Sequence, residues 1–215
     1  MEHEQELREF TINSAQELGL TIGESHAKQF MSYLAHLMTW NKTINLTAIT
    51  DQKEIIIKHF VDSLAALVAT SFPQNAAVLD VGSGGGFPGI PLKILRPDLR
   101  LVLIDPVQKK CSFLNSMIGL LTLHDVSTFN GTIEQYAKRP LDHAIDMVVV
   151  RALKFQDIKE HIPTLLSSDG KVVLYRTDPI THQELDGKFH IVSETALDLP
   201  QKSGKRVISV IEIEH

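Results

Sequence analysis

The stretch AVLDVGSGGGFPGIPLKIL, residues 77–95, constrains the fold of this chain more than any other. It places five of the chain's 12 glycines between Gly82 and Gly89, directly after an apolar run. Each glycine adds unfolded-state entropy that folding must overcome, about 0.5–1 kcal/mol relative to alanine. A glycine-rich turn between a strand and a helix lets a ligand approach the backbone amides at the helix N-terminus. The stretch therefore predicts a strand, a ligand-binding loop and a helix.

Two cofactor motifs fit the same letters. Gly84, Gly86 and Gly89 match G-x-G-x-x-G, a pattern of NAD and FAD sites. Asp80, Gly82, Gly84 and Gly86 match D-x-G-x-G-x-G, the pattern of S-adenosylmethionine-dependent methyltransferases. The first pattern predicts a dinucleotide at this loop, and the second predicts a sulfonium nucleoside.

Two details favour the methyltransferase pattern. Asp80 ends near the mouth of the first strand, where a carboxylate can engage a cationic amino-acid group directly or through water but would repel a pyrophosphate. The two prolines of FPGIP remove N–H donors that a pyrophosphate would use. We therefore expect S-adenosylmethionine as the cofactor, with Gly82, Gly84 and Gly86 beside its methionine and ribose parts.

The second expected strand, LVLID, ends in an acidic residue, Asp105. Both cofactor motifs require a carboxylate at this place. We expect Asp105 to accept hydrogen bonds from both ribose hydroxyls, each worth ~1.5–3 kcal/mol because the acceptor is charged.

The rest of the chain predicts an α/β fold. Residues up to about Thr70 have helical spacing, and Asp51 is placed to cap a helix over the following residues. The expected strands are AVLDV, LVLID, DVSTF, IDMVVV and KVVLY, followed by KFHIVSE and KRVISVIEIE as an antiparallel hairpin at one edge. Segments long enough for crossover helices separate the first four, which predicts a mostly parallel sheet with helices on both faces. We expect one compact unit, with an N-terminal helical cap over residues 1–70 and the cofactor domain over residues 71–215.

Composition limits the class of protein. The formal net charge of −5 argues against a protein that coats itself in nucleic acid, although a local basic patch is compatible with it. A single cysteine, Cys111, allows no internal disulfide and fits a reducing cytoplasm. The sequence has no apolar run of about 18 residues, and its N-terminus lacks the apolar core of a signal peptide. Its ten histidines form no metal-binding motif. We expect a cytoplasmic protein without membrane or metal.

Longer pieces of the chain resemble a known family. The segments WNKTINLTAITDQKEIIIKHFVDSL and VLDVGSGGGFPGIPLKILRPDLRLVLIDPVQKKCSFL are similar to the glucose-inhibited division protein B family. Its members, also called ribosomal RNA small subunit methyltransferase G, are bacterial 16S rRNA guanine-N7 methyltransferases. The resemblance runs from about Trp40 to Tyr175. It implies a class I S-adenosylmethionine-dependent methyltransferase fold, which is Rossmann-like with a mostly parallel seven-stranded sheet. It also implies methylation of a guanine near the decoding region.

The resemblance also implies particular site residues. Cofactor contacts fall on Gly82 and Phe87 in the loop, with Ile133 and Glu134 at the adenine end. Arg151 lies at the active-site edge as a cofactor contact and a catalytic residue. The segment HFVDSL adds three residues near the cofactor mouth, of which the first is a second catalytic candidate: His59, Asp62 and Ser63.

Some positions depart from the family pattern. The usual DSxxKR reads DPVQKK here, so Pro106 and Lys110 replace serine and arginine. An arginine is lost at Thr132, and Arg176 takes the place of a lysine. Because the exchanged residues are mostly basic, these departures affect the expected RNA affinity and target more than cofactor binding.

The expected chemistry needs little from the protein beyond alignment. Guanine N7 already carries a lone pair, so no base must remove a proton, and alignment alone can supply up to ~7–11 kcal/mol. An arginine at Arg151 can donate to guanine O6 or hold a phosphate. Six basic residues are further candidates for RNA contact: Lys109, Lys110, Lys138, Arg139, Lys154 and Arg176.

The expected partner is 16S rRNA or the small ribosomal subunit, bound by a monomer. Two alternatives stay open at the level of sequence. One is a methyltransferase that acts on another RNA or a small molecule, and the other is a cofactor-binding regulatory or ribosome-assembly protein.

Overall fold

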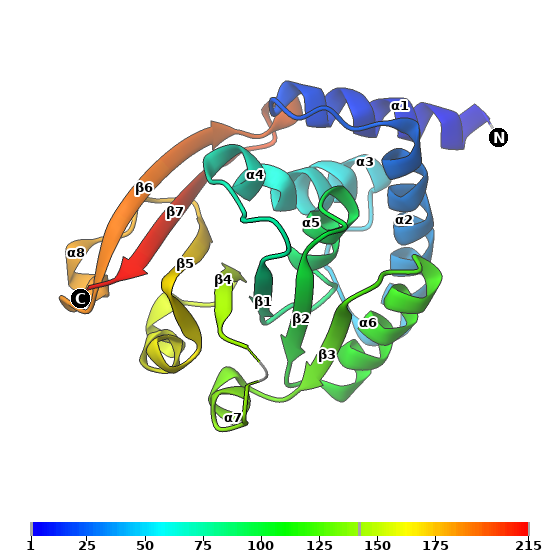
Figure 1. The fold of residues 1–215 in the computed structure, drawn as a ribbon. Helices are drawn as coiled ribbons and strands as arrows, with labels where there is room; N and C mark the ends of the chain where they lie inside the picture. The colour runs from blue at the N-terminus through cyan, green and yellow to red at the C-terminus, as the bar shows by residue number, and fades with distance from the viewer. Residues whose placement is uncertain (1, 142, 215) are drawn as a thin grey trace.

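The computed structural model describes residues 2–141 and 143–214. A seven-stranded sheet forms its centre, with the strand order β3-β2-β1-β4-β5-β7-β6 (Figure 1). The strands are β1 (Ala77–Val81), β2 (Arg100–Asp105), β3 (Val126–Asn130), β4 (Ile145–Arg151), β5 (Leu166–Arg176), β6 (Phe189–Asp198) and β7 (Lys205–Ile213). The first five run parallel to one another, and β7 pairs antiparallel with both β5 and β6. The expected mostly parallel sheet with a late hairpin at one edge is confirmed.

Helices precede the sheet and connect its strands. They are α1 (Glu2–Glu17), α2 (Glu24–Ile44), α3 (Gln52–Ile55), a π-helix (Ile56–Val61), α4 (Asp62–Ala69), α5 (Gly89–Leu95), α6 (Gln108–Leu120), α7 (Ile133–Ala137) and α8 (His182–Leu185). Short 3-10 helices cover Phe155–Asp157, Lys159–Thr164 and Pro200–Lys202. Asp51 caps α3 as expected, since its side chain accepts a hydrogen bond from the Glu54 N–H. The π-helix was not expected, because the sequence pattern of residues 52–70 is that of an uninterrupted helix.

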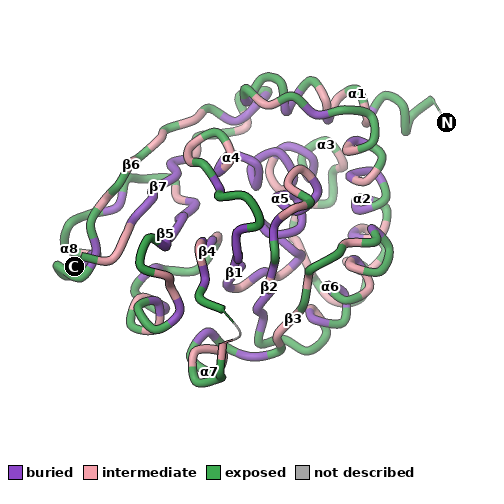
Figure 2. Tube along the Cα trace, viewed as in Figure 1, coloured by how far each residue is buried: buried purple, intermediate pink, exposed green. Residues whose placement is uncertain are grey.

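The two faces of the sheet carry different covers. On one face, α2, the π-helix and α4 to α6 pack with α1 into a core that includes Phe30, Phe60 and Val149. On the other, α7 and the 3-10 helices after β4 form a second core around Phe155 and Ile162. The central strands β1 and β4 are buried on both faces. In the edge strand β6, partly buried residues alternate with exposed ones (Figure 2). Within the described residues, no helix is long and apolar enough to cross a membrane.

The strand order determines where a ligand site can lie. β1 is flanked by β2 on one side and by β4 on the other, so the direction of chain crossover reverses at β1. Ligands of open α/β sheets bind at such a reversal, outside the carboxyl ends of the strands. The glycine loop after β1, Asp105 at the end of β2 and Arg151 at the end of β4 all lie at this edge.

Candidate functional site

The glycine loop exposes bare backbone at one position. Gly82, Gly84 and Gly86 have φ values of +76°, +57° and +90°, in the region that favours glycine. A Cβ added to Gly84 would meet nothing closer than a backbone oxygen at 3.8 Å. One added to Gly86 would lie 2.5 Å from the Tyr33 hydroxyl. Gly84 therefore faces open space, while Gly86 is required by packing against α2.

Asp105 lies beside Gly84 and retains free acceptor capacity. Its Oδ2 accepts a hydrogen bond from the Gly84 N–H at 3.0 Å, and its Oδ1 accepts one from the Val107 N–H at 2.9 Å. The Lys110 ammonium lies 3.7 Å from Oδ2. A carboxylate has about four acceptor sites, so two remain beyond these amides, although only 3% of the residue is exposed. This carboxylate and the bare backbone at Gly84 fit a ribose with adjacent hydroxyls.

The expected adenine-end residues start α7, next to Asp105. The Gly131 N–H donates to the Asp105 backbone oxygen at 3.1 Å, which holds the end of β3 against the end of β2. Ile133 is buried in the second core. The Glu134 side chain is exposed and pairs with Lys138 at 2.7 Å, so its carboxylate points to solvent.

Asp80 does not lie where the sequence pattern suggested. The residue is fully buried beneath the loop, and its Oδ2 accepts a hydrogen bond from the Gly89 N–H at 2.8 Å. Burial raises the pKa of Asp80 to about 7, although the Gly89 hydrogen bond acts to lower it. The reason for the difference is that α5 begins directly above β1, so its first amide takes the carboxylate. Asp80 thus supports the loop from below through Oδ2, while its Oδ1 is buried without a hydrogen-bond partner among the described residues.

Arg151 reaches from β4 into the N-terminal helices. Its Nη1 donates to Asp62 Oδ2 at 3.0 Å and to the Lys58 backbone oxygen at 3.2 Å. Its Nη2 lies 2.7 Å from His59 Nδ1, and its guanidinium lies over the Phe87 ring at 5.2 Å from the centroid. The side chain is 13% exposed. The structure thus brings together Arg151, His59 and Phe87, which the family resemblance implied.

His59 is held at both ring nitrogens. Its Nε2 lies 2.6 Å from the Thr47 hydroxyl, and its ring stacks on Phe87 with centroids 4.7 Å apart. The Asn41 amide fixes Thr47 through hydrogen bonds to its backbone oxygen and N–H at 2.8 and 2.9 Å. Since Arg151 donates to Nδ1, the proton of the neutral ring belongs on Nε2. Burial, followed by the charge of Arg151, lowers the pKa of His59 to about 3, so the ring is neutral at physiological pH.

Asp62 joins two arginines in the interior. Its side chain is 0% exposed, and Arg206 from β7 binds it with Nε to Oδ1 and Nη2 to Oδ2, both at 2.6 Å. We call Asn41, Thr47, His59, Asp62, Arg151 and Arg206 the Arg151 cluster. Ser63 lies beside it, fully buried, with its hydroxyl donating to the His59 backbone oxygen at 2.5 Å.

Two members of the Arg151 cluster, Thr47 and Arg206, were missed from the sequence as site residues, and Asn41 was considered only for stacking on a base or for packing. Asn41 and Thr47 lie inside the WNKTINLT segment that carries the family resemblance, which was a usable signal. Arg206 gave no signal, because its partner Asp62 is 144 residues away in the chain.

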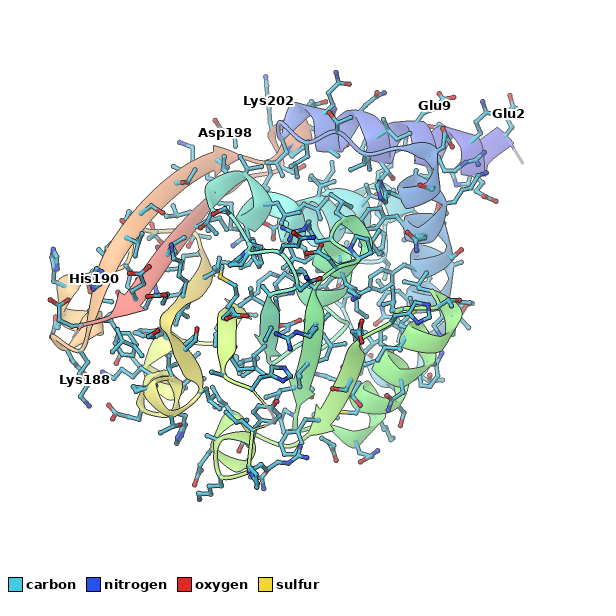
Figure 3. The ribbon with its side chains drawn as sticks, viewed as in Figure 1. Glu2, Glu9, Lys188, His190, Asp198 and Lys202 are labelled. Atoms are coloured by element: carbon cyan, nitrogen blue, oxygen red, sulfur yellow. The ribbon has the colours of Figure 1, made fainter. Side chains whose placement is uncertain are left out.

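The expected RNA-contacting residues divide into two groups. Four are engaged within the protein: Lys138 pairs with Glu134, Lys110 lies 3.7 Å from Asp105, the Arg176 guanidinium is held by Glu184 at 3.0 Å, and Arg139 lies over the Phe129 ring. Lys109 and Lys154 are exposed beside the ends of β2 and β4. The start of β7 pairs with the end of β5, which places Lys205 near the end of that strand, and Lys202 lies beside the end of α1 (Figure 3). These four lysines are the better candidates for contact with an anion.

The described part of the chain contains no group of three or more histidine, cysteine or acidic side chains that could hold a metal ion. What the edge offers instead is bare backbone, a ribose-compatible carboxylate, an anchored arginine and exposed lysines.

The chain is also similar in sequence to known proteins. A family model described as rRNA small subunit methyltransferase G matches residues 26–208. A curated protein from Staphylococcus aureus (strain Newman), ribosomal RNA small subunit methyltransferase G, is 32% identical over 212 residues. That match covers 95% of this chain and 89% of the relative.

Solved structures share the fold at lower identity. The O-methyltransferase TomG from Streptomyces achromogenes, solved with S-adenosylmethionine, superposes with a TM-score of 0.58 at 19% identity, covering 85% of this chain and 90% of its own. The ribosomal protein L11 methylase from Lactobacillus delbrueckii subsp. bulgaricus gives 0.57 at 18% identity, covering 74% and 79%. Both likenesses concern the fold of the sheet and its helices.

Proposed function

The chain belongs to the rRNA small subunit methyltransferase G family, and from that premise we propose that it methylates N7 of a guanine in 16S rRNA. It is an S-adenosylmethionine-dependent enzyme with the class I methyltransferase fold. The observation that carries the proposal is the meeting of two structures at one edge of the sheet. The glycine loop with Asp105 forms the first, and the Arg151 cluster forms the second.

We propose that Gly82, Gly84, Phe87 and Asp105 hold the cofactor, with Ile133 and Glu134 near its adenine end. Open space at Gly84 and the remaining acceptor capacity of Asp105 support this placement. Asp80 contributes by fixing the Gly89 amide below the loop. When bound, S-adenosylmethionine would supply an electrophilic methyl group, to which the N7 lone pair would bond as the methyl–sulfur bond breaks and the neutral thioether leaves.

The role proposed for Arg151 is to orient the guanine. The cluster occupies Nη1 and Nη2, whereas Nε makes no hydrogen bond within residues 2–141 and 143–214 and can donate to guanine O6 or a phosphate oxygen. Burial lowers the pKa of Arg151 while the Asp62 carboxylate opposes that shift. An arginine anchored in this way loses little conformational freedom when it binds.

His59 acts on Arg151 rather than on a proton of the substrate. Both ring nitrogens are engaged, and the low pKa makes the ring a poor base. Guanine N7 needs no base, so the absence of a free proton acceptor among these residues agrees with the chemistry. We propose His59 as a positioning residue and Arg151 as the catalytic one.

We also propose the cellular setting. The partner is 16S rRNA, free or in the small subunit, approached through Lys109, Lys154, Lys202 and Lys205. The enzyme acts as a monomer in the cytoplasm, where that RNA is found. The cap, residues 1–70, and the methyltransferase domain, residues 71–215, form one compact unit. The core that joins Phe30 and Phe60 to Val149 supports that proposal.

The test is methyl transfer by the purified protein. The protein is incubated with S-adenosylmethionine and either naked 16S rRNA or small subunits from a strain lacking its own enzyme. The methylated atom is then mapped by strand cleavage at 7-methylguanosine. We expect one 7-methylguanosine per RNA with at least one of the two substrates. Methylation at another atom or of another molecule would favour the first alternative, and cofactor binding without transfer would favour an assembly protein.

A second measurement tests the cofactor. Calorimetry should show binding of S-adenosylhomocysteine and much weaker binding of NADH. Tighter binding of NADH would restore the dinucleotide interpretation of the glycine loop.

A further inference from the structure

The residue two positions after Arg151 is a leucine in an unusual setting. Leu153 is 44% exposed, which makes it one of only a few large apolar side chains so open among the described residues. The turn that presents it passes through Ala152 at φ +70°, a left-handed conformation that costs a non-glycine residue about 1–2 kcal/mol. Backbone strain of this kind is typical of functional sites. The chain therefore maintains a costly turn that directs an apolar side chain toward solvent.

Leu153 lies directly against the cofactor loop. A Cβ added to Gly82 would come within 2.6 Å of Leu153 Cδ1 and 3.0 Å of its Cγ. The absence of a side chain at Gly82 is thus what allows Leu153 to lie on the backbone. Of the loop glycines, Gly84 faces open space and Gly82 faces this leucine. Leu153 therefore covers the backbone at Gly82, two residues before the bare backbone at Gly84.

An apolar side chain suits this place chemically. The Arg151 guanidinium already supplies a cation at the proposed edge of the base, so the face of the base can be met by an uncharged side chain. Leucine offers the flat face of a base an apolar surface without charge, and apolar contact with base faces is insensitive to the direction of hydrogen bonds. Arg151 reads the edge of the base, so the face needs a different partner.

We propose that Leu153 is a substrate-contact residue, whose side chain forms the apolar surface against which the face of the target guanine lies beside the cofactor loop and Arg151. This inference rests on the proposed function, because it assigns a residue to the base in that same site. Neither charge nor hydrogen bonding is required of residue 153, only apolar area at this point.

The experiment compares three variants with the wild-type protein in the rRNA methylation assay. Leu153→Ala should lower kcat/KM for rRNA at least about fivefold, because it removes most of the apolar area at this point. Its affinity for S-adenosylhomocysteine, measured by calorimetry, should stay within about twofold of wild type. Leu153→Phe, which restores apolar area, should recover at least half of the lost activity. Leu120→Ala is the matched control, since Leu120 is 48% exposed at the far end of α6 and should change neither quantity.

Each outcome decides the proposal. It is overturned if Leu153→Ala keeps wild-type kcat/KM, or loses cofactor affinity by the same factor as activity, which would make Leu153 part of the cofactor site. It is also overturned if Leu153→Phe is as inactive as the alanine variant. A wild-type protein that leaves guanine N7 unmodified would instead overturn the proposed function, and this inference with it.

Discussion

The loop around Gly84 and the Arg151 cluster lie at one edge of the sheet but are held in opposite ways. The loop is fixed by backbone amides that donate to two carboxylates, Asp105 and Asp80, all within a short stretch of chain. The cluster is fixed by side chains from α2, the loop after it, the π-helix, α4, β4 and β7.

This difference separates two tasks. The loop proposed to hold the cofactor is built from glycines and two acids. The arginine proposed to orient the base is held by a buried carboxylate and a neutral histidine, in a cluster that the N-terminal helices complete. The π-helix at Ile56–Val61 is where this second construction distorts the regular helix, as π-helices often do at functional sites.

Removing Asp62 should have the largest effect, because it leaves two buried arginines without their anion. We expect Asp62→Ala to lower the free energy of unfolding by about 3–5 kcal/mol, measured by urea denaturation. The control is Glu160→Ala, which breaks the exposed pair with Lys188 at 3.0 Å and should change stability by about 0.5 kcal/mol. Equal effects of the two variants would mean that the cluster does not depend on the buried carboxylate.

The two regions should also separate in function. Asp105→Ala should weaken S-adenosylhomocysteine binding at least about tenfold, because each hydrogen bond to the carboxylate is worth ~1.5–3 kcal/mol. Arg151→Lys, which keeps the charge but loses the planar fork, should leave that affinity unchanged and lower kcat for rRNA. Calorimetry and the methylation assay give the two readouts. If both variants lose cofactor affinity alike, the division of the site into two regions is wrong.

Within the loop, two glycines should respond differently to alanine. Gly84→Ala should cost about 1 kcal/mol of stability, since φ +57° is reachable for alanine, but it should reduce cofactor affinity. Gly86→Ala should cost more stability, because its Cβ would lie 2.5 Å from the Tyr33 hydroxyl. Gly187→Ala, at φ +66° with open space around it, is the control for strain alone and should leave cofactor binding intact.

The smallest expected effect concerns pH. The pKa of His59 is about 3 in the folded protein and about 6.5 in the unfolded chain. Neutral His59 therefore makes its full contribution to the free energy of unfolding above pH ~6.5. The contribution declines as the pH falls toward 3, because in that range only the unfolded chain takes up a proton. Between about pH 7.5 and 5.5, wild type should lose about 1 kcal/mol relative to His59→Gln.

Urea denaturation of both proteins at the two pH values measures that difference. Asp80, whose pKa is raised to about 7, shifts stability the other way, but it is present in both proteins and cancels. A difference that is independent of pH would mean that His59 titrates normally and that its hydrogen bond to Arg151 is not formed.

The sequence predicts the glycine loop well and the Arg151 cluster poorly. The strand, glycines and helix of residues 77–95 are adjacent in the chain, so local patterns place them correctly, and Asp105 follows from the end of the next strand. The depth of Asp80 could not be predicted, because β1 is buried on both faces and alternation then carries no information. The contacts of Arg151 with Asp62 and His59 depend on how helices and sheet pack, and only the family resemblance pointed to them.

A crystal structure with S-adenosylhomocysteine is the measurement that tests the account most directly. We expect the ribose hydroxyls to bind the Asp105 carboxylate and the nucleoside to lie over Gly84. The sulfur should face Leu153 and Arg151. Density for the ligand elsewhere, or a ribose that makes no contact with Asp105, would contradict it.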